Sequence, residues 1–180
     1  MENCYIEFEP ISAHSLNRTN QIFEIIKVEK ESGRNPNEEY ITNSLNESEK
    51  SYFTNFTEEE FKEWNQFWFS TPIEIRHSAN MPTPGWDLES MYDAFWSGEY
   101  QLIAIVKVGK VYQLQFSPYS YPYGGTGCMV ALLESMGNNI IGIEDGTGYW
   151  GYIKPTNIWK PKSKIMRLPP PQKQQSDRLF

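Results

Sequence analysis

The stretch QLIAIVKVGKVYQLQF, residues 101–116, decides the fold class of this chain. Its first half is an apolar run that predicts a buried strand over residues 101–108. Gly109-Lys110 follows, and glycine at the first position of a two-residue loop indicates a type II′ hairpin turn. The second half alternates between apolar residues and glutamines, with an apolar face formed by Tyr112, Leu114 and Phe116. The stretch therefore predicts an antiparallel hairpin.

The chain beyond this hairpin predicts one helix and a second hairpin. Residues 128–136 form an apolar segment that Gly137 is expected to end as a helix. Residues 139–143 and 149–153 are predicted as strands, because a turn sequence rich in glycine and acidic residues separates them. The second half of the chain is thus expected to be strand, strand, helix, strand, strand.

The first half is predicted to be mostly helical. Apolar residues recur at helical spacing over residues 15–30, and Thr57 with Glu60 forms a capping box before another helix. Asp87 is expected to cap a further helix, which Gly98 ends. The fold class is therefore α+β, with a helical N-terminal half packed on a small antiparallel sheet. Residues 5–8 are a possible short strand whose place in the sheet the sequence leaves open.

Length and composition predict a single domain with a tail. We expect one α+β domain over residues 1–159 and an exposed, Pro- and Gln-rich tail over residues 160–180. The tail holds six basic residues and one acidic residue, a formal charge of +5. The preceding 159 residues therefore carry −12, because the whole chain carries −7. A body this acidic repels nucleic acid and anionic membranes and attracts basic partners.

The N-terminus and the cysteine content indicate a cytoplasmic protein. The first ten residues contain no basic residue, so they do not resemble a signal peptide, and the chain contains no apolar run long enough for a membrane span. Cys4 and Cys128 are the only cysteines, and we expect both to be free thiols.

Aromatic and acidic residues in two loops are the main candidates for a contact surface. One loop alternates tyrosine with proline and serine, and the other places two acids beside two aromatic residues. Tyrosine and tryptophan make effective contacts with protein partners. The same pattern also fits rings that cover a sheet edge around a simple hairpin turn. The candidate partner-binding residues are Tyr119, Tyr121, Tyr123, Glu144, Asp145, Tyr149 and Trp150.

A glycine-rich turn precedes the second-half helix and is a candidate anion site. The backbone of Gly125, Thr126 and Gly127 could hold an anion at the helix N-terminus. The spacing matches neither the P-loop nor the dinucleotide fingerprint. The simpler interpretation is that the glycines allow a sharp turn and that Thr126 caps the helix.

An enzymatic alternative would use Cys128 as a nucleophile. Cys128 lies near the predicted helix N-terminus, where the pKa of its thiol could be lowered, and His77 with Asp145 would complete a Cys–His–acid set. The opposing interpretation is a cysteine that is merely buried. The sequence gives no reason to expect a cofactor, and two histidines exclude a zinc site with several His ligands.

Three segments together resemble a known class of proteins. They are Trp96-Ser-Gly-Glu-Tyr100, Pro122-Tyr-Gly-Gly-Thr-Gly127 and Glu144-Asp-Gly-Thr-Gly-Tyr149, within residues 86–153. This part of the chain resembles bacterial immunity proteins that protect against polymorphic or contact-dependent toxins. The resemblance implies a non-enzymatic protein that binds and blocks a cognate toxin domain, and it carries over no catalytic residues.

The sequence thus leaves three hypotheses for function. The first is a protein-binding module of the immunity type whose partner is a basic toxin domain, which fits the acidic body. The second is a small-molecule enzyme that uses Cys128 and His77 beside the glycine-rich turn. The third is a regulatory protein whose basic tail binds an acidic partner. Neither nucleic acid nor membrane is expected as a partner.

Overall fold

The computed structural model describes residues 4–33, 37–78, 81–121 and 123–161. The described part of the chain contains seven helices and a five-stranded antiparallel sheet, which confirms the predicted α+β class. By its contacts the chain divides into two compact units. Of the described residues, the first unit comprises those up to Asn55 and Gly85–Pro155, and the second comprises those within Phe56–Pro84 and those from Thr156 to Pro161. The predicted tail lies outside the described residues from residue 162.

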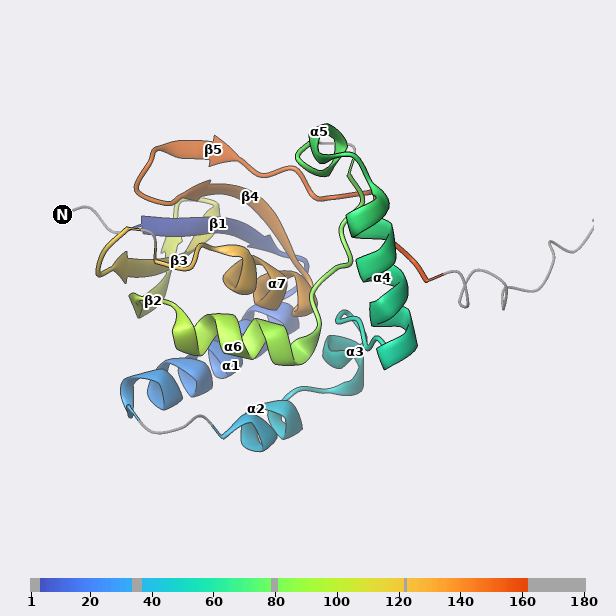
Figure 1. The fold of residues 1–180 in the computed structure, drawn as a ribbon. Coiled ribbons are helices and arrows are strands. Elements are labelled where there is room, and N and C mark those ends of the chain that lie inside the picture. The colour runs from blue at the N-terminus through green and yellow to red at the C-terminus, as the bar shows by residue number, and fades with distance from the viewer. Residues whose placement is uncertain (1–3, 34–36, 79–80, 122, 162–180) are drawn as a thin grey trace, which may run out of the picture. The chain divides into compact units, whose positions relative to one another are not determined.

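The first unit is built on one sheet with the strand order β2-β3-β1-β4-β5, in which every neighbouring pair is antiparallel (Figure 1). The predicted order of strand, strand, helix, strand, strand is confirmed for the second half. The strands are β1 (Cys4–Pro10), β2 (Tyr100–Val108), β3 (Val111–Pro118), β4 (Asn138–Glu144) and β5 (Tyr149–Gly151).

Strand β1 occupies the centre of this sheet. Ile6 pairs with Leu114 of β3 on one side and with Ile143 of β4 on the other. Its residues alternate, so that Ile6 and Phe8 are fully buried while Glu7 is half-buried on the opposite face. The short strand that the sequence could not place is therefore the one that joins the two hairpins.

Three helices of the first unit cover one face of the sheet: α1 (Ala13–Glu31), α6 (Leu88–Ser97) and α7 (Gly127–Ser135) (Figure 1). Side chains of Ser12 and Asp87 accept hydrogen bonds from backbone N–H groups and start α1 and α6, so the predicted Asp87 cap is confirmed. Helix α7 is the most enclosed, because seven of its nine residues are buried between the sheet and the other helices. The core therefore lies between this layer and strands β1, β3 and β4.

Two short helices follow α1 in the chain, α2 (Glu38–Ser44) and α3 (Glu47–Lys50). Arg18 of α1 holds them in place, since its guanidinium donates to both carboxylate oxygens of the buried Glu49 and to the Ser44 carbonyl, each at 2.7 Å. Burial alone would raise the pKa of Glu49, but hydrogen bonds from Arg18 and Asn46 outweigh it and lower that pKa.

The second unit contains α4 (Glu58–Ser70) and the single turn α5 (Ile73–Arg76). The predicted capping box at the start of α4 is confirmed, because Thr57 and Glu60 bond reciprocally. Trp64 packs against Phe67, Trp68 and Trp159 with ring centroids 5.4–5.8 Å apart. Backbone hydrogen bonds from Thr83 to Asn157 and from Trp159 to Thr83 tie the two segments of this unit together.

The predicted hairpin over residues 101–116 is present, but the prediction of a buried first strand is wrong. Strand β2 is an edge strand, where Ile103 and Ile105 are only half-buried and Val108 is exposed. An apolar run fits a half-buried edge as well as a buried strand. The predicted two-residue loop with glycine at its first position is confirmed. Gly109 has a φ of +61°, and Val108 and Val111 on either side of the loop are paired.

Replacing Gly98 by a residue with a Cβ should reduce the stability of the fold. An added Cβ would lie 2.1 Å from Cε1 of Tyr100, whose side chain is fully buried. The backbone of Gly98, at φ −64° and ψ 129°, suits any residue, so the cost is steric alone. We expect Gly98→Ala to lower the free energy of unfolding by about 1–3 kcal/mol in urea denaturation.

The matched control is Gly151→Ala, because an added Cβ at this strand glycine meets no atom within 4 Å. We expect its effect to stay below about 0.5 kcal/mol. Equal losses in the two variants would contradict the steric argument.

Candidate functional site

The face of the sheet opposite the helices is the candidate site. On β1, Tyr5, Glu7 and Glu9 alternate onto this face, and the paired strands add Gln113, Gln115, Gly142, Glu144 and Tyr149. The described residues that β1, β3, β4 and β5 place on this face include three glutamates and no Lys or Arg. The uncovered face is therefore acidic and rich in Tyr and Gln side chains.

Glu7 organises the centre of this face. Its carboxylate accepts a hydrogen bond from the Tyr149 hydroxyl at 2.9 Å and another from the Gln113 amide at 3.1 Å. Gln115 extends the chain by donating to Gln113 at 3.3 Å. Tyr149 also lies near Tyr5, with ring centroids 6.4 Å apart. One network thus links β5 to β1 and β3 and fixes the orientation of Tyr149.

Gly142 makes this arrangement possible. Tyr149 lies on β5 and must reach across β4 to meet Glu7 on β1. An added Cβ at Gly142 would lie 2.1 Å from the Tyr149 hydroxyl oxygen and 2.4 Å from Cζ. The absence of a side chain at this position therefore lets the Tyr149 ring lie flat over the sheet.

A hollow of about 890 Å³ lies at the end of the sheet where β1 begins. It is lined by the first residues of β1, the end of β3 and the turn between β4 and β5, including Tyr5, Gln115, Ser117, Glu144 and Thr147. Its lining is polar and acidic, which suits a basic or hydrogen-bonding group of a partner better than an apolar ligand.

The turn over residues 144–148 is held by its own acids. Glu144 accepts hydrogen bonds from the backbone N–H groups of Gly146 and Gly148, and Asp145 accepts from the backbone and hydroxyl of Thr147. Burial would raise the pKa of Asp145, but the bonds from Thr147 and from the Trp150 side chain outweigh it and lower that pKa. Both carboxylates thus rigidify the loop that carries them.

The structure does not bring the predicted contact residues onto a single surface. Glu144 and Tyr149 are cross-strand partners on the open face. Trp150 is the next residue on β5 and pairs with the buried Ile143, so its side chain points to the opposite face. Tyr121 is 79% exposed in the loop after β3. Only part of the predicted set therefore belongs to the open face.

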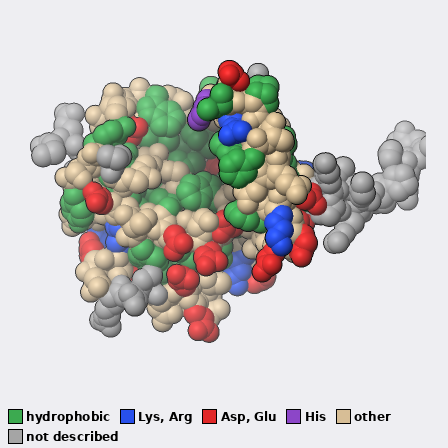
Figure 2. Space-filling view, in the orientation of Figure 1, with side chains coloured by type: hydrophobic (Ala, Val, Ile, Leu, Met, Phe, Trp, Pro, Cys, Tyr) green, Lys and Arg blue, Asp and Glu red, His purple; other side chains and the backbone are tan. Residues whose placement is uncertain are grey.

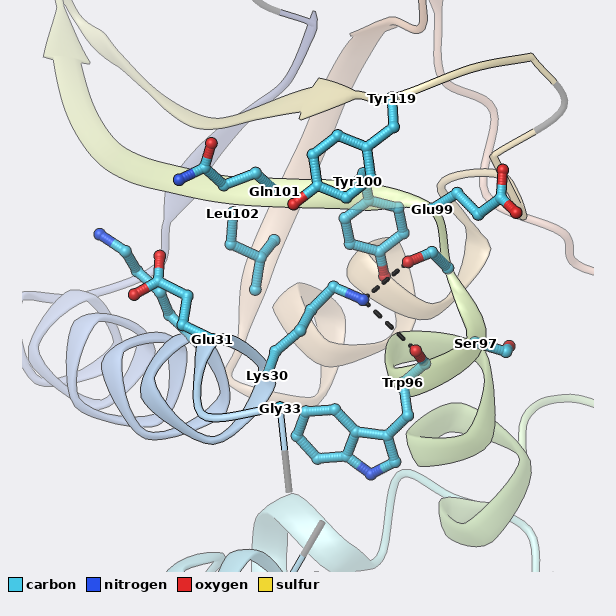
Figure 3. A pocket seen from close by; sticks show the side chains of 12 residues that line it. Lys30, Glu31, Gly33, Trp96, Ser97, Glu99, Tyr100, Gln101, Leu102 and Tyr119 are labelled. Atoms are coloured by element: carbon cyan, nitrogen blue, oxygen red, sulfur yellow. Dashed lines mark hydrogen bonds between the residues drawn. The ribbon is translucent and has the colours of Figure 1, made fainter. Parts of the chain in front are cut away.

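Tyr119 lies at a different place, beside a pocket of about 450 Å³ at the edge of β2 (Figure 3). Lys30 points into this pocket and donates to the carbonyls of Phe95 and Gly98 at the end of α6, while its ammonium lies 4.6 Å from the centroid of Tyr100. Burial lowers the pKa of Lys30. Lys30 thus satisfies backbone carbonyls at the C-terminal end of α6.

The expectation that Tyr123 belongs to a contact surface is wrong. Its side chain is 5% exposed and packs between Tyr100 and Phe116, with ring centroids 6.2 and 5.6 Å away. Burial is the main reason that the pKa of Tyr123 is raised. Exposed and buried tyrosines look alike in the sequence, and here the ring belongs to the core beside β2 and β3.

The glycine-rich turn serves backbone geometry. Gly125 has a φ of +82°, and an added Cβ at Gly127 would lie 2.7 Å from Trp86. Thr126 occupies the N-cap position of α7, but its side chain makes no capping hydrogen bond, so that part of the prediction is wrong. The Trp86 ring thus packs directly against the start of α7.

Cys128 does not have the activated thiol that the enzymatic alternative requires. It is 2% exposed, and burial raises the pKa of its thiol, contrary to the expected lowering by the helix N-terminus. Its sulfur lies 3.4 Å from the Tyr100 hydroxyl in the core. His77 is exposed at the end of α5, in the second unit, whereas Cys128 and Asp145 belong to the first.

Two features of the described residues bear on other functions. No three or more His, Cys, Asp or Glu side chains gather there in a way that could hold a metal ion. None of the described helices combines the length and apolar character that crossing a bilayer requires.

Comparison with known proteins adds no relative. No family model, curated protein or solved structure matches this chain. The resemblance to immunity proteins therefore stays a prediction that rests on the residues quoted for it.

Sequence reasoning missed the central residues of the open face, Glu7, Gln113 and Gly142. The alternation of Tyr5 to Glu9 was the available signal for an uncovered face, since acids alternate there with apolar residues. The pairing of β1 with both hairpins, which brings these residues together, is a long-range feature that no local pattern encodes.

Tyr149 should titrate above an ordinary tyrosine. Its hydrogen bond to Glu7, then burial and the Glu7 charge, raise its pKa. The stabilising contribution of this contact is therefore present below the unfolded pKa of tyrosine and lost as the pH rises through the folded value. NMR titration of ring-labelled protein should show a lower Tyr149 pKa in Glu7→Gln, with Glu24→Gln on α1 as an unaffected control.

The two thiols should be unreactive in the folded protein. Cys4 and Cys128 are buried and both have a raised pKa, mainly through burial. We expect Ellman's reagent to label neither within minutes at pH 8, and to label both in 6 M guanidinium. Rapid native labelling that disappears in Cys128→Ser would contradict this prediction and revive the enzymatic alternative.

Proposed function

We propose that this protein is a non-enzymatic binding module that inhibits a basic protein partner, in the manner of an immunity protein against its toxin. The observation that supports this most directly is the open face of the first unit, where the described residues of β1, β3, β4 and β5 present Glu7, Glu9 and Glu144 with tyrosines and no Lys or Arg. The formal charge of −7 on the whole chain also attracts a basic partner, and does so over a longer range.

The physical basis is a combination of steering and anchoring. Acidic clusters raise the association rate with a basic partner and select against acidic ones. Tyr149 supplies contact area, and its bond to Glu7 fixes the ring before a partner arrives, which lowers the entropy cost of binding. The hollow beside Glu144 accommodates a protruding basic side chain of the partner.

The enzymatic alternative has less support. It depends on a nucleophilic Cys128, and this thiol is buried with a raised pKa. A protein-binding surface requires no nucleophile, so we propose the binding function rather than the enzymatic one.

The proposal is tested by capture with matched charge variants. Four immobilised proteins are compared: wild type, Glu9→Lys, Tyr149→Ala and the control Glu24→Lys. Each is incubated with lysate of the protein's own source cells at low salt and at roughly 0.5 M salt, where exposed charges are largely screened. Glu9 and Glu24 are both exposed, but Glu24 lies on α1, in the helical layer. We expect wild type and Glu24→Lys to retain one basic protein that Glu9→Lys and Tyr149→Ala lose.

The captured protein is then purified and its affinity measured by calorimetry. We expect Tyr149→Ala to weaken binding by at least about tenfold, as for a contact worth over 1 kcal/mol. The activity of the partner should fall on addition of wild-type protein but not of Tyr149→Ala. Equal binding by all four proteins, or a partner whose activity is unchanged in the complex, would contradict the proposal.

A further inference from the structure

Helix α4 in the second unit leaves large apolar side chains in contact with solvent. Phe61 is 55% exposed and Phe69 is 72% exposed, and the adjoining turn α5 adds Ile73 at 60% and Ile75 at 48%. Figure 2 shows hydrophobic side chains over α5 and the neighbouring end of α4, with charged side chains over the other end of α4. Large exposed apolar side chains on one helix and its adjoining turn often mark an interaction site.

The inner side of α4 is already occupied. Trp64 packs against Phe67, Trp68 and Trp159, which form the aromatic cluster of the unit. Phe61, Asn65 and Phe69 lie beside this cluster at positions i, i+4 and i+8, so they form one stripe along the helix. We call these three residues the α4 stripe.

The α4 stripe is symmetric about Asn65. One phenylalanine lies four residues before Asn65 and the other lies four residues after it. If two such helices pair antiparallel about a two-fold axis at Asn65, each Phe61 meets the partner's Phe69. The two Asn65 side chains then face each other, and amide groups can donate to and accept from one another. A closed dimer requires a surface that is self-complementary in this way.

The charges at the two ends of α4 favour the same antiparallel arrangement. The helix begins with the exposed Glu58 and Glu59. At its other end Arg76 lies over Trp68 and Phe69, with its guanidinium carbon 5.7 and 5.9 Å from the two ring centroids, and donates to the Phe69 carbonyl. Antiparallel pairing brings Glu58 and Glu59 of one helix toward the end of the other that carries Arg76 beside Glu74, whereas parallel pairing would place Glu58 and Glu59 against their own copies.

We propose that the α4 stripe is a homodimer interface, in which α4 pairs antiparallel with α4 of a second copy of this chain. The surface is distinct from the open sheet face, so this inference does not depend on the proposed inhibitory function. A helix of 13 residues is about 20 Å long, and a contact of that size is small for a stable dimer. We therefore expect a dissociation constant in the micromolar range.

Sedimentation velocity of the full chain across roughly 1–200 μM tests the association, a range set by the expected affinity. Wild type should shift from monomer to dimer. Phe69→Glu places an acid opposite the acidic end of the partner helix and should raise the dissociation constant at least about a hundredfold, because the change occurs twice in a symmetric dimer. Gln66→Glu, an exposed position on the polar side of the same helix, should dimerise like wild type.

Disulfide trapping tests the symmetry. Under mild oxidation Asn65→Cys should form a covalent dimer. Phe61→Cys alone should not, but an equimolar mixture of Phe61→Cys and Phe69→Cys should. The wild-type chain is the control for its two buried cysteines. Circular dichroism of every variant checks that α4 remains folded.

Three outcomes would overturn the proposal. The first is a wild-type chain that stays monomeric at 200 μM. The second is a dimer that Phe69→Glu leaves intact, or in which Phe61→Cys links to itself, as in a parallel pair. The third is a full chain that is monomeric while a chain ending at Pro161 dimerises. That result would mean that the chain's own C-terminal residues, and not a second copy, cover the α4 stripe.

Discussion

The sheet of the first unit depends on the pairing of β1 with both β3 and β4. Without β1 the chain has two hairpins, β2–β3 and β4–β5, that share no hydrogen bond. The pairs Ile6–Leu114 and Ile6–Ile143 each close a loop of more than 100 residues. Such closure costs entropy that local contacts do not recover, so the fully buried side chains of Ile6 and Phe8 must supply the stabilisation.

The same strand also creates the candidate site. Side chains alternate along β1. Because Ile6 and Phe8 face the helices, Tyr5, Glu7 and Glu9 must face away from them. Glu7 lies at the middle of the sheet, where it is within reach of Gln113 on β3 and, across Gly142, of Tyr149 on β5. A carboxylate at a sheet centre would be costly to desolvate without partners, and these two donors offset part of that cost while leaving its charge available. The stability of the sheet and the chemistry of its open face therefore both depend on β1.

Prediction from sequence succeeded where the signal is local. The caps at Thr57 and Asp87 and the glycine turn at residue 109 depend on a few neighbouring residues, and each is found as expected. Prediction failed where burial is decided by distant segments. Tyr123 is buried because Tyr100 and Phe116 flank it, and β2 is an edge because β3 pairs with β1 on its other side. Likewise, the helix N-terminus suggested an activated Cys128, but enclosure by the core has the larger effect on its thiol. The open face was only partly foreseen, since Glu144 and Tyr149 were predicted whereas Glu7 was not.

The two proposed binding surfaces rest on different forces, and this difference makes them separable in solution. The open sheet face relies on carboxylates that are screened as the salt concentration rises, so binding through it should weaken with ionic strength. The α4 stripe relies mainly on two phenylalanines, and the burial of apolar surface is little affected or strengthened by salts such as sulfate. A protein with both surfaces can therefore lose its partner at high salt while it keeps its oligomeric state. An association that persists at high salt therefore favours α4, and one that is lost favours the sheet face.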